Sequence, residues 1–243
     1  MSKKRYLYGI LILLIIWKCL NLFYDSRLIP GPVDTAIYAF THIDLLTVNS
    51  LYSMFRLLCA VILVIAVGLP LGIILGTSKK IDNVISPVIY AIYPVPKIAF
   101  LAVIMMFFGL GNTSKIALIF FILIFQMVLS IRDGVIGIEK EVYFSVYNLS
   151  LNKMQTFRHI ILPNILPNLF TSLRIGIATS FSVLFLAENY ATQYGLGYFI
   201  MDSWIMAKYT RMFAGILTIS FLGSCLFVLV NYLEHKLCRY KFI

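Results

Sequence analysis

The chain has 243 residues, of which 61% are hydrophobic and 12% are charged, and its formal net charge is +10. Because an ordinary soluble domain has roughly 25% charged residues, this composition excludes a typical soluble domain and indicates a protein that crosses a membrane several times. The lysines and arginines are spread over short connections rather than gathered on one face, which argues against a nucleic-acid partner. The four cysteines have no metal-ligand spacing and fall mostly in apolar runs, so we interpret them as buried apolar side chains outside any disulfide framework.

The first apolar run covers residues 8–24 and is interrupted by Lys18. Its basic start would also suit a signal peptide, but no small-residue cleavage site follows. We therefore interpret residues 1–24 as a first transmembrane helix, in which Lys18 extends to the interface or faces a neighbouring helix. Residues 25–49 are too polar to cross a bilayer and form a connector.

The next two apolar runs predict the second span at 57–77 and the third at 84–108. Several glycines in the second span permit close approach of a neighbouring helix. Prolines interrupt the third span, and such a helix is tolerated only where neighbouring helices, water or a cavity satisfy the freed carbonyl groups. We predict that the third span lines a pathway, with Pro94 and Pro96 as pathway or gate residues.

A fourth span is predicted at 116–131, and a polar, partly amphipathic segment follows at 139–167. One apolar stripe at helical spacing runs through this segment: Leu151, Met154, Phe157 and Ile161. Ser150 is the expected N-cap, and Pro163 and Pro167 are expected to end the helix.

A short helix that is apolar on one side and lies between two spans is typical of a docking element, with Met154 and Phe157 as its anchors. The alternative is a helix that lies flat in the lipid interface.

A fifth span is predicted at 169–187 and a sixth at 213–233. Arg174 near the start of the fifth span and Glu188 at its end are about 21 Å apart along a helix, too far for a mutual salt bridge. Ionisable groups near spans are costly and often functional. Both side chains are therefore pathway candidates, with extension to the membrane interface as the alternative.

Six spans place both termini on the same side of the membrane. With the N-terminus in the cytoplasm, the inner side carries twelve basic residues: Lys3, Lys4, Arg5, Lys79, Lys80, Arg132, Lys140, Lys153, Arg158, Lys236, Arg239 and Lys241. The outer side carries four: Arg27, Lys115, Lys208 and Arg211. Because short cytoplasmic loops are rich in lysine and arginine, the count predicts cytoplasmic termini and a cytoplasmic segment at 139–167.

The sequence has no phosphate-binding GxxxxGK[ST], no GxGxxG after a strand and no HExxH. It therefore predicts no catalytic residue, no metal site and no cofactor. The three histidines lie outside the predicted spans, which argues against a haem pair.

Residues 141–167, EVYFSVYNLSLNKMQTFRHIILPNILP, resemble the cytoplasmic EAA loop of binding-protein-dependent ABC transporter permeases. The stretch 155–178, QTFRHIILPNILPNLFTSLRIGIA, is most similar to the sulfonate, nitrate and taurine branch of that family. The resemblance extends over about residues 50–234 and includes Gly-Leu-Gly at 195–197, which would help to shape an outer surface facing the binding protein. Where the family typically has Glu-Ala-Ala and, four residues on, Gly, this chain has Phe144, Ser145, Val146 and Ser150.

The resemblance implies a single permease domain over 1–243, with an all-α, polytopic membrane fold and a cytoplasmic coupling helix in the loop 139–167. The implied partners are a cytoplasmic ABC ATPase dimer, an extracytoplasmic solute-binding protein, a second permease copy in a homodimer, and membrane lipid. The residues implied in ATPase docking are Ser150, Leu151, Asn152, Met154, Gln155 and Phe157. The implied cargo is a small solute such as a sulfonate, nitrate, taurine, bicarbonate or a vitamin precursor.

Two other classes remain open from the residues alone. A membrane scaffold or redox-complex subunit without transport activity would show bound haem or quinone and no associated ATPase. A secondary transporter is the weaker alternative, because no inverted repeat is detectable in 243 residues.

Overall fold

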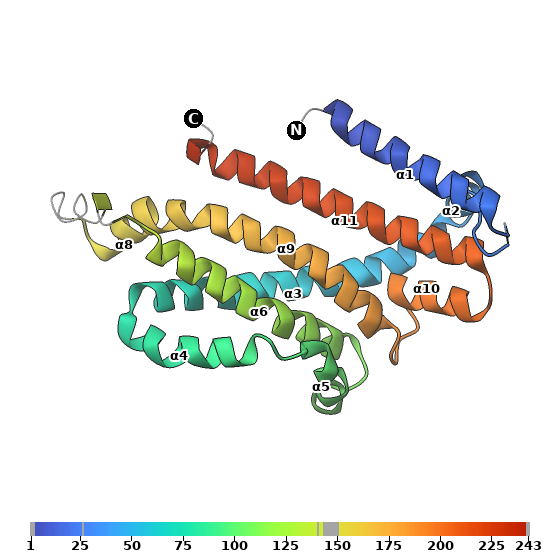
Figure 1. Ribbon diagram of the computed structural model, residues 1–243. Helices are drawn as coiled ribbons and strands as arrows, with labels where there is room; N and C mark the ends of the chain where they lie inside the picture. The colour runs from blue at the N-terminus through green and yellow to red at the C-terminus, as the bar shows by residue number, and fades with distance from the viewer. Residues whose placement is uncertain (1–2, 26, 140, 143–150, 242–243) are drawn as a thin grey trace. The chain divides into compact units, whose positions relative to one another are not determined.

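A computed structural model describes residues 3–25, 27–139, 141–142 and 151–241, and every regular element in these residues is a helix (Figure 1). In chain order the elements are α1 (Lys3–Phe23), α2 (Pro32–Thr41), α3 (Ile43–Thr77), α4 (Lys79–Ile92), η1 (Lys97–Phe100), α5 (Leu101–Phe108), α6 (Asn112–Ile136), α8 (Lys153–Thr156), η2 (Phe157–Ile161), α9 (Leu162–Glu188), α10 (Leu196–Ile205), α11 (Tyr209–Leu237) and η3 (Arg239–Lys241). The all-α fold that the sequence predicts is confirmed.

Four helical runs in the described residues are long and apolar enough to cross a membrane: α3, α6, α11 and the run Lys153–Glu188, which joins α8, η2 and α9. The helices α4 and α5 form a fifth candidate span that is bent by 85°. The structure thus supports four or five of the six predicted spans. The first predicted span is helical as α1, and its crossing of the membrane stays a prediction.

Two compact units make up the chain. The first unit comprises residues 1–54 and 185–222. Within it, the ring of Trp17 on α1 stacks on Phe213 of α11 with ring centroids 5.7 Å apart, and its Nε1 donates to the carbonyl of Pro30 at 3.0 Å. The short helix α10 packs closely on α11, since a Cβ at Gly215 would lie 2.7 Å from Ile200.

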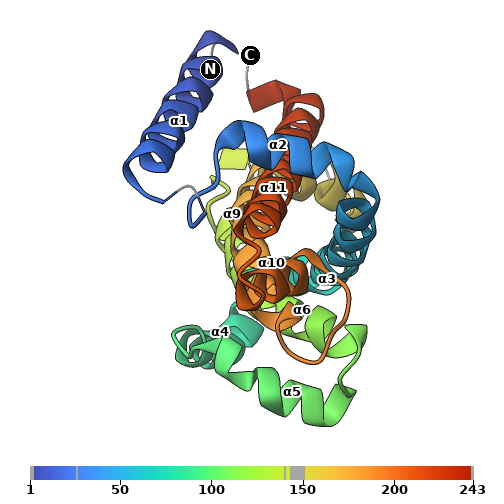
Figure 2. The same ribbon diagram turned by 90° about the vertical axis from the view of Figure 1, so that its right-hand side faces the viewer.

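The second unit comprises residues 55–184 and 223–243. Its core is formed by apolar side chains from α3, α6 and the run from η2 into α9, which lie alongside one another (Figures 1 and 2). Its buried members on α3 and α6 are Ala60, Val64, Ile119, Leu123, Met127, Ile131 and Val135. Burial of this stripe between three helices holds them as one packed layer.

Small residues bring α3 and α6 close together. Gly68, Gly72 and Gly76 recur every four residues on α3, and a Cβ at the last two would lie 2.6 Å from Ile131 and 2.4 Å from Val135. Only glycine allows this approach, because any side chain would push the helices apart.

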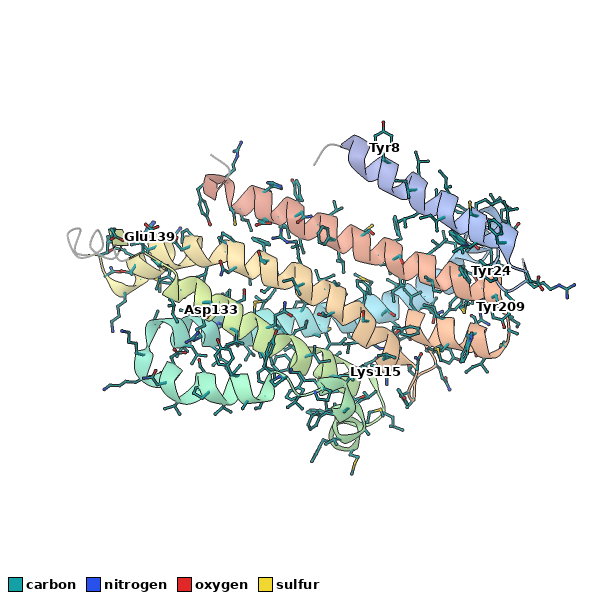
Figure 3. All side chains as sticks on the ribbon, in the orientation of Figure 1. Tyr8, Tyr24, Lys115, Asp133, Glu139 and Tyr209 are labelled. Carbon is teal, nitrogen blue, oxygen red and sulfur yellow. The ribbon has the colours of Figure 1, made fainter. Side chains whose placement is uncertain are left out.

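The position of Lys115 differs from the one assumed in the count of basic residues on the outer side. The sequence places it in an outer connection, but it lies in the first turn of α6 and is 0% exposed (Figure 3). Its Nζ donates to the carbonyls of Leu110 at 3.1 Å and Gly111 at 3.3 Å. Lys115 therefore belongs to a helix and not to the outer connection in which the prediction placed it.

Candidate docking segment and membrane passage

The helix predicted at 151–161 begins with a capping box. Asn152 Oδ1 accepts a hydrogen bond from the backbone N–H of Gln155 at 2.8 Å, and Gln155 Oε1 accepts one from the N–H of Asn152 at 2.9 Å. This reciprocal pair satisfies two N–H groups that the helix start leaves free. The cap is therefore Asn152 and not Ser150, which lies outside the described residues. The spacing Asn-x-x-Gln at residues 152–155 is the sequence pattern that identifies this cap.

The predicted helix end at Pro163 and Pro167 is wrong. The helical run Lys153–Glu188 is 36 residues long and includes both prolines. Before Pro163 the run widens into the π-helical turn Phe157–Ile161, where the N–H of Leu162 bonds to the carbonyl five residues earlier. Such a turn relieves the contact of a proline ring with the preceding turn of an α-helix.

Tyr240 stabilises the helix at the second proline, Pro167, by supplying a hydrogen-bond donor. Because Pro167 has no N–H, it leaves the carbonyl of Pro163 without its usual helical donor. The hydroxyl of Tyr240, in η3, donates to that carbonyl. The helix thus passes both prolines and joins the docking segment directly to the following span.

The apolar stripe of the docking segment is divided between two environments. Leu151 and Phe157 are half-buried and pack against the core of the second unit. Met154 is 70% exposed, and Asn152 and Gln155 beside it are also exposed. Of the residues expected to dock, Leu151 and Phe157 therefore anchor the segment to its own protein. The other described ones, Asn152, Met154 and Gln155, form an exposed surface.

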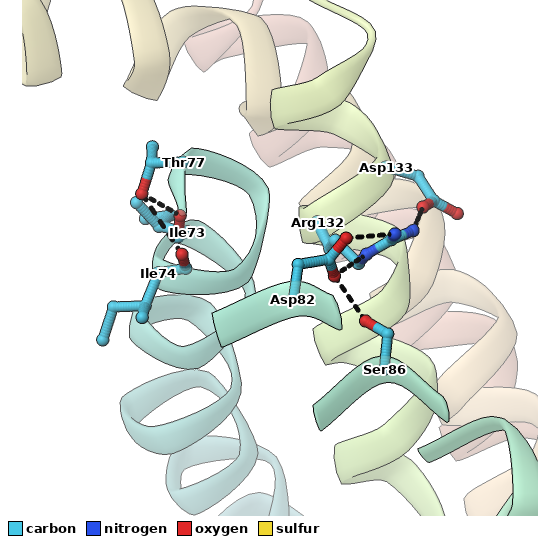
Figure 4. Close-up of polar contacts among 7 residues, drawn as sticks. All are labelled: Ile73, Ile74, Thr77, Asp82, Ser86, Arg132 and Asp133. Atoms are coloured by element: carbon cyan, nitrogen blue, oxygen red, sulfur yellow. Dashed lines mark hydrogen bonds and ion pairs between the residues drawn. The ribbon is translucent and has the colours of Figure 1, made fainter. Parts of the chain in front are cut away.

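An ion pair fixes the end of α6 that leads into the docking segment (Figure 4). Arg132 on α6 binds Asp82 on α4 through two nitrogens, with 2.6 Å between Nη2 and Oδ2, and its Nη1 lies 2.8 Å from Asp133. Ser86 donates a further hydrogen bond to Asp82 at 2.5 Å. A two-pronged pair of this kind is geometrically specific, so it holds α4 and α6 in a defined register. This pair is not predictable from the sequence, because the partners are fifty positions apart and no spacing rule links them.

The third predicted span is broken between α4 and η1. The prolines Pro94 and Pro96 lie in this break and are exposed. The helical segments Lys79–Ile92 and Lys97–Phe108 on either side of the break are bent by 85° relative to each other. The change of direction between α4 and α5 can be followed in the ribbon (Figures 1 and 2). The placement of these two prolines in a pathway stays a prediction.

Arg174 joins α9 to α11 inside the second unit. Its Nη1 donates to Asn231 at 2.9 Å and forms an ion pair with Glu234, while its Nη2 donates to Thr171 at 3.1 Å. Pairing lowers the cost of a charge within a span. The side chain is thus held between helices, and a role in the pathway stays a prediction.

Glu188, which is 0% exposed, holds the turn before α10 in the first unit. Three successive backbone N–H groups of this turn donate hydrogen bonds to side chains. The N–H of Gly195 donates to Asn49 Oδ1 at 2.9 Å, and that of Leu196 donates to Ser53 Oγ at 2.8 Å. The N–H of Gly197 donates to Glu188 Oε2 at 2.8 Å. Ser53 Oγ also lies 2.9 Å from both oxygens of Glu188. A carboxylate at the start of a helix is favoured by the helix dipole. Sequence reasoning placed Glu188 near the Gly-Leu-Gly motif but missed its partners on α3.

Among the described residues, no three His, Cys, Asp or Glu side chains gather as a metal site would require. The polar groups described above bind one another or the backbone. The arrangement is that of a membrane-spanning protein with an exposed surface around Met154, a broken candidate span and charge pairs between helices.

The sequence of this chain matches a known protein family. Residues 68–239 match the family described as binding-protein-dependent transport system inner membrane component, and the chain belongs to this family. It is therefore a permease component of a binding-protein-dependent ABC importer, a multi-pass inner-membrane protein and a non-catalytic subunit.

Similar proteins have names that point to small solutes. The taurine transport system permease protein of Escherichia coli is 30% identical over 76% of this chain and 67% of its own length. A putative aliphatic sulfonates transport permease protein of Bacillus subtilis is 26% identical over 89% of this chain and 79% of its own length. A nitrate import permease protein of Synechocystis is 27% identical over 69% of this chain and 61% of its own length.

A solved structure has the same fold. A chain of the MetNI methionine ABC transporter, in an inward-facing conformation, matches with a TM-score of 0.63 at 17% sequence identity. The match covers 78% of this chain and 92% of that chain. At this identity the likeness concerns the fold alone.

Proposed function

We propose that this chain, as one permease domain over 1–243, pairs with a second copy to carry a small solute of the sulfonate, nitrate and taurine class across the inner membrane. A cytoplasmic ATPase dimer supplies the energy through the segment 139–167, and an extracytoplasmic binding protein delivers the solute. Both termini lie in the cytoplasm. The names of the relatives support the solute class, and the family supports the partnership with a binding protein.

The observation that carries this proposal is the continuity of the helix that bears the docking surface. Exposed Met154 lies in the first turn of the run Lys153–Glu188, which continues unbroken through a span. Because the helix is continuous, ATP-driven movement at Met154 would be passed along the chain directly to α9.

The test compares three variants of exposed or half-buried side chains. Met154→Asp places a charge on an apolar anchor and should reduce ATPase co-purification and substrate-stimulated ATP hydrolysis at least roughly tenfold, since loss of an interface anchor costs about 2 kcal/mol. It should leave the melting temperature of the isolated permease unchanged. Phe157→Ala should lower that melting temperature, because Phe157 packs in the chain's own core. Met206→Asp is the matched control, as Met206 is a comparably exposed methionine on the connection after α10.

Normal ATPase binding by Met154→Asp would show that the docking surface lies elsewhere. Failure of the unaltered permease to co-purify with any ATPase would overturn the proposed function itself.

A further inference from the structure

A lysine, Lys97, begins η1 directly after the break that follows α4, and its ammonium group lies against a carbonyl and two aromatic rings. Lys97 Nζ donates to the carbonyl of Tyr93 at 2.6 Å, and it lies 5.0 Å from the ring centre of Tyr93 and 5.4 Å from that of Phe125 on α6. In a continuous helix the Tyr93 carbonyl would accept from the backbone N–H of Lys97. Here the ammonium group takes that position.

Among the residues that the structure describes, no carboxylate forms an ion pair with Lys97. Three arginines of the helices form ion pairs with carboxylates: Arg132 with Asp82, Arg174 with Glu234, and Arg211 with Asp202. Within the described part of the chain, Lys97 has a carbonyl and two aromatic rings in place of a carboxylate. Rings attract a cation but carry no net charge, so they do not neutralise the ammonium group of Lys97.

The break is also open at the surface of the protomer. Tyr93 is 46% exposed and Val95 is 36% exposed, and Pro94 and Pro96 between and beside them are exposed as well. Non-helical backbone and an uncompensated cation at membrane depth are tolerated where they meet protein or water, and not where they meet lipid tails. This combination fits a water-filled passage of the assembled permease.

We propose that Lys97 is a contact site for a small anion, such as a sulfonate, in that passage; this inference rests on the proposed function. A lysine ammonium is a compact point charge on a flexible stem. Held over two rings, it can draw an anion into the break and release it, whereas a paired arginine could not. The electrically neutral cradle formed by Tyr93 and Phe125 keeps the charge available to the ligand.

The experiment uses the permease assembled with its ATPase in membrane vesicles. The native cysteines are replaced by serine, and Val95→Cys provides one thiol beside Lys97. Its rate of modification is measured with two methanethiosulfonates of similar size, one bearing a sulfonate and one bearing a trimethylammonium group. A positive unit charge about 6 Å from a thiol in water raises the rate for the anionic reagent roughly threefold and lowers the rate for the cationic reagent by the same factor. Lys97→Gln removes this charge, so it should lower the ratio of the anionic to the cationic rate roughly tenfold.

Three further measurements make the result specific. Lys97→Arg keeps the charge and should preserve the ratio, and Lys80→Gln, the same change near the other end of α4, should leave it unaltered. Methanesulfonate, used as a small anionic probe, should slow modification in the parent and have no such effect in Lys97→Gln.

Two results would overturn the proposal. One is a thiol at position 95 that neither reagent reaches. The other is a rate ratio that does not respond to Lys97→Gln. Either result, obtained in a parent complex that retains ATP-driven uptake, rejects the anion site and leaves the proposed function standing. Loss of ATPase association in the parent would instead reject the proposed function.

Discussion

The turn before α10 packs against the buried carboxylate of Glu188, which occupies the space that a side chain at position 195 would need. Gly195 has a φ of 133°, which side-chain-bearing residues rarely adopt, and a Cβ there would lie 2.4 Å from Cδ of Glu188. Backbone conformation and space therefore both require glycine at this position. The Gly-Leu-Gly sequence is thus explained by the packing of Glu188 against the backbone.

A series of glycine substitutions separates these two requirements. Gly111→Ala should be neutral, because Gly111 has a φ of −81° and no atom within 4 Å of its Cβ position. Gly109→Ala should cost about 1–3 kcal/mol from backbone strain alone, since its φ is 76° with open space around it. Gly195→Ala combines strain with the clash and should lower the melting temperature in detergent most. Equal melting temperatures for Gly195→Ala and Gly111→Ala would contradict the contact with Glu188.

At the scale of elements, the run Lys153–Glu188 shows how a helix can pass two prolines that lie four residues apart. Each proline removes one N–H donor and crowds the carbonyl four residues earlier. The π-helical turn accommodates Pro163, and Tyr240 satisfies the carbonyl that Pro167 leaves free. The C-terminal η3 therefore contributes to the integrity of the helix that begins at the exposed surface around Met154.

A double-mutant cycle tests this role of Tyr240. Tyr240→Phe should destabilise the permease by about 1 kcal/mol, the net contribution of a typical hydrogen bond. In a Pro167→Ala background the new N–H at position 167 can bond to the Pro163 carbonyl, so Tyr240→Phe should then have little effect. The measurement is the melting temperature of the permease in detergent for all four combinations. Equal losses in both backgrounds would mean that the hydroxyl of Tyr240 acts through other contacts.

The elements show what the sequence could and could not predict. Continuous apolar runs identified the spans, because a bilayer requires them, but α3 begins at Ile43, well before the predicted start at 57. Its first turns are polar and looked like a connector, whereas in the structure Asn49 and Ser53 bind the backbone of the turn at 195–197. Local pattern cannot reveal a partner about 140 positions away. For the same reason, periodicity predicted the apolar stripe of the docking segment but not which side of it the core would cover.

At the scale of the whole molecule, the orientation in the membrane follows from charge and length together. The run Lys153–Glu188 is 36 residues long, and such a helix spans about 54 Å, well beyond the roughly 30 Å of a hydrocarbon core. We therefore expect its two ends to emerge on opposite sides of the membrane. The basic residues gather on the side of Lys153, so we expect that end in the cytoplasm.

Single cysteines at the two ends of this run test the orientation. In a background without native cysteines, Lys153→Cys should be protected from a membrane-impermeant thiol reagent in spheroplasts and labelled in inverted vesicles. Gln193→Cys, in the exposed connection between α9 and α10, should show the reverse. Lys153 is preferable to Asn152 as a probe, because a change at Asn152 would remove the capping box and alter the docking segment being measured. Labelling of Lys153→Cys from outside, with protection of Gln193→Cys, would invert the molecule and place the exposed surface around Met154 away from ATP. Labelling of both from the same side would mean that the run does not cross the membrane.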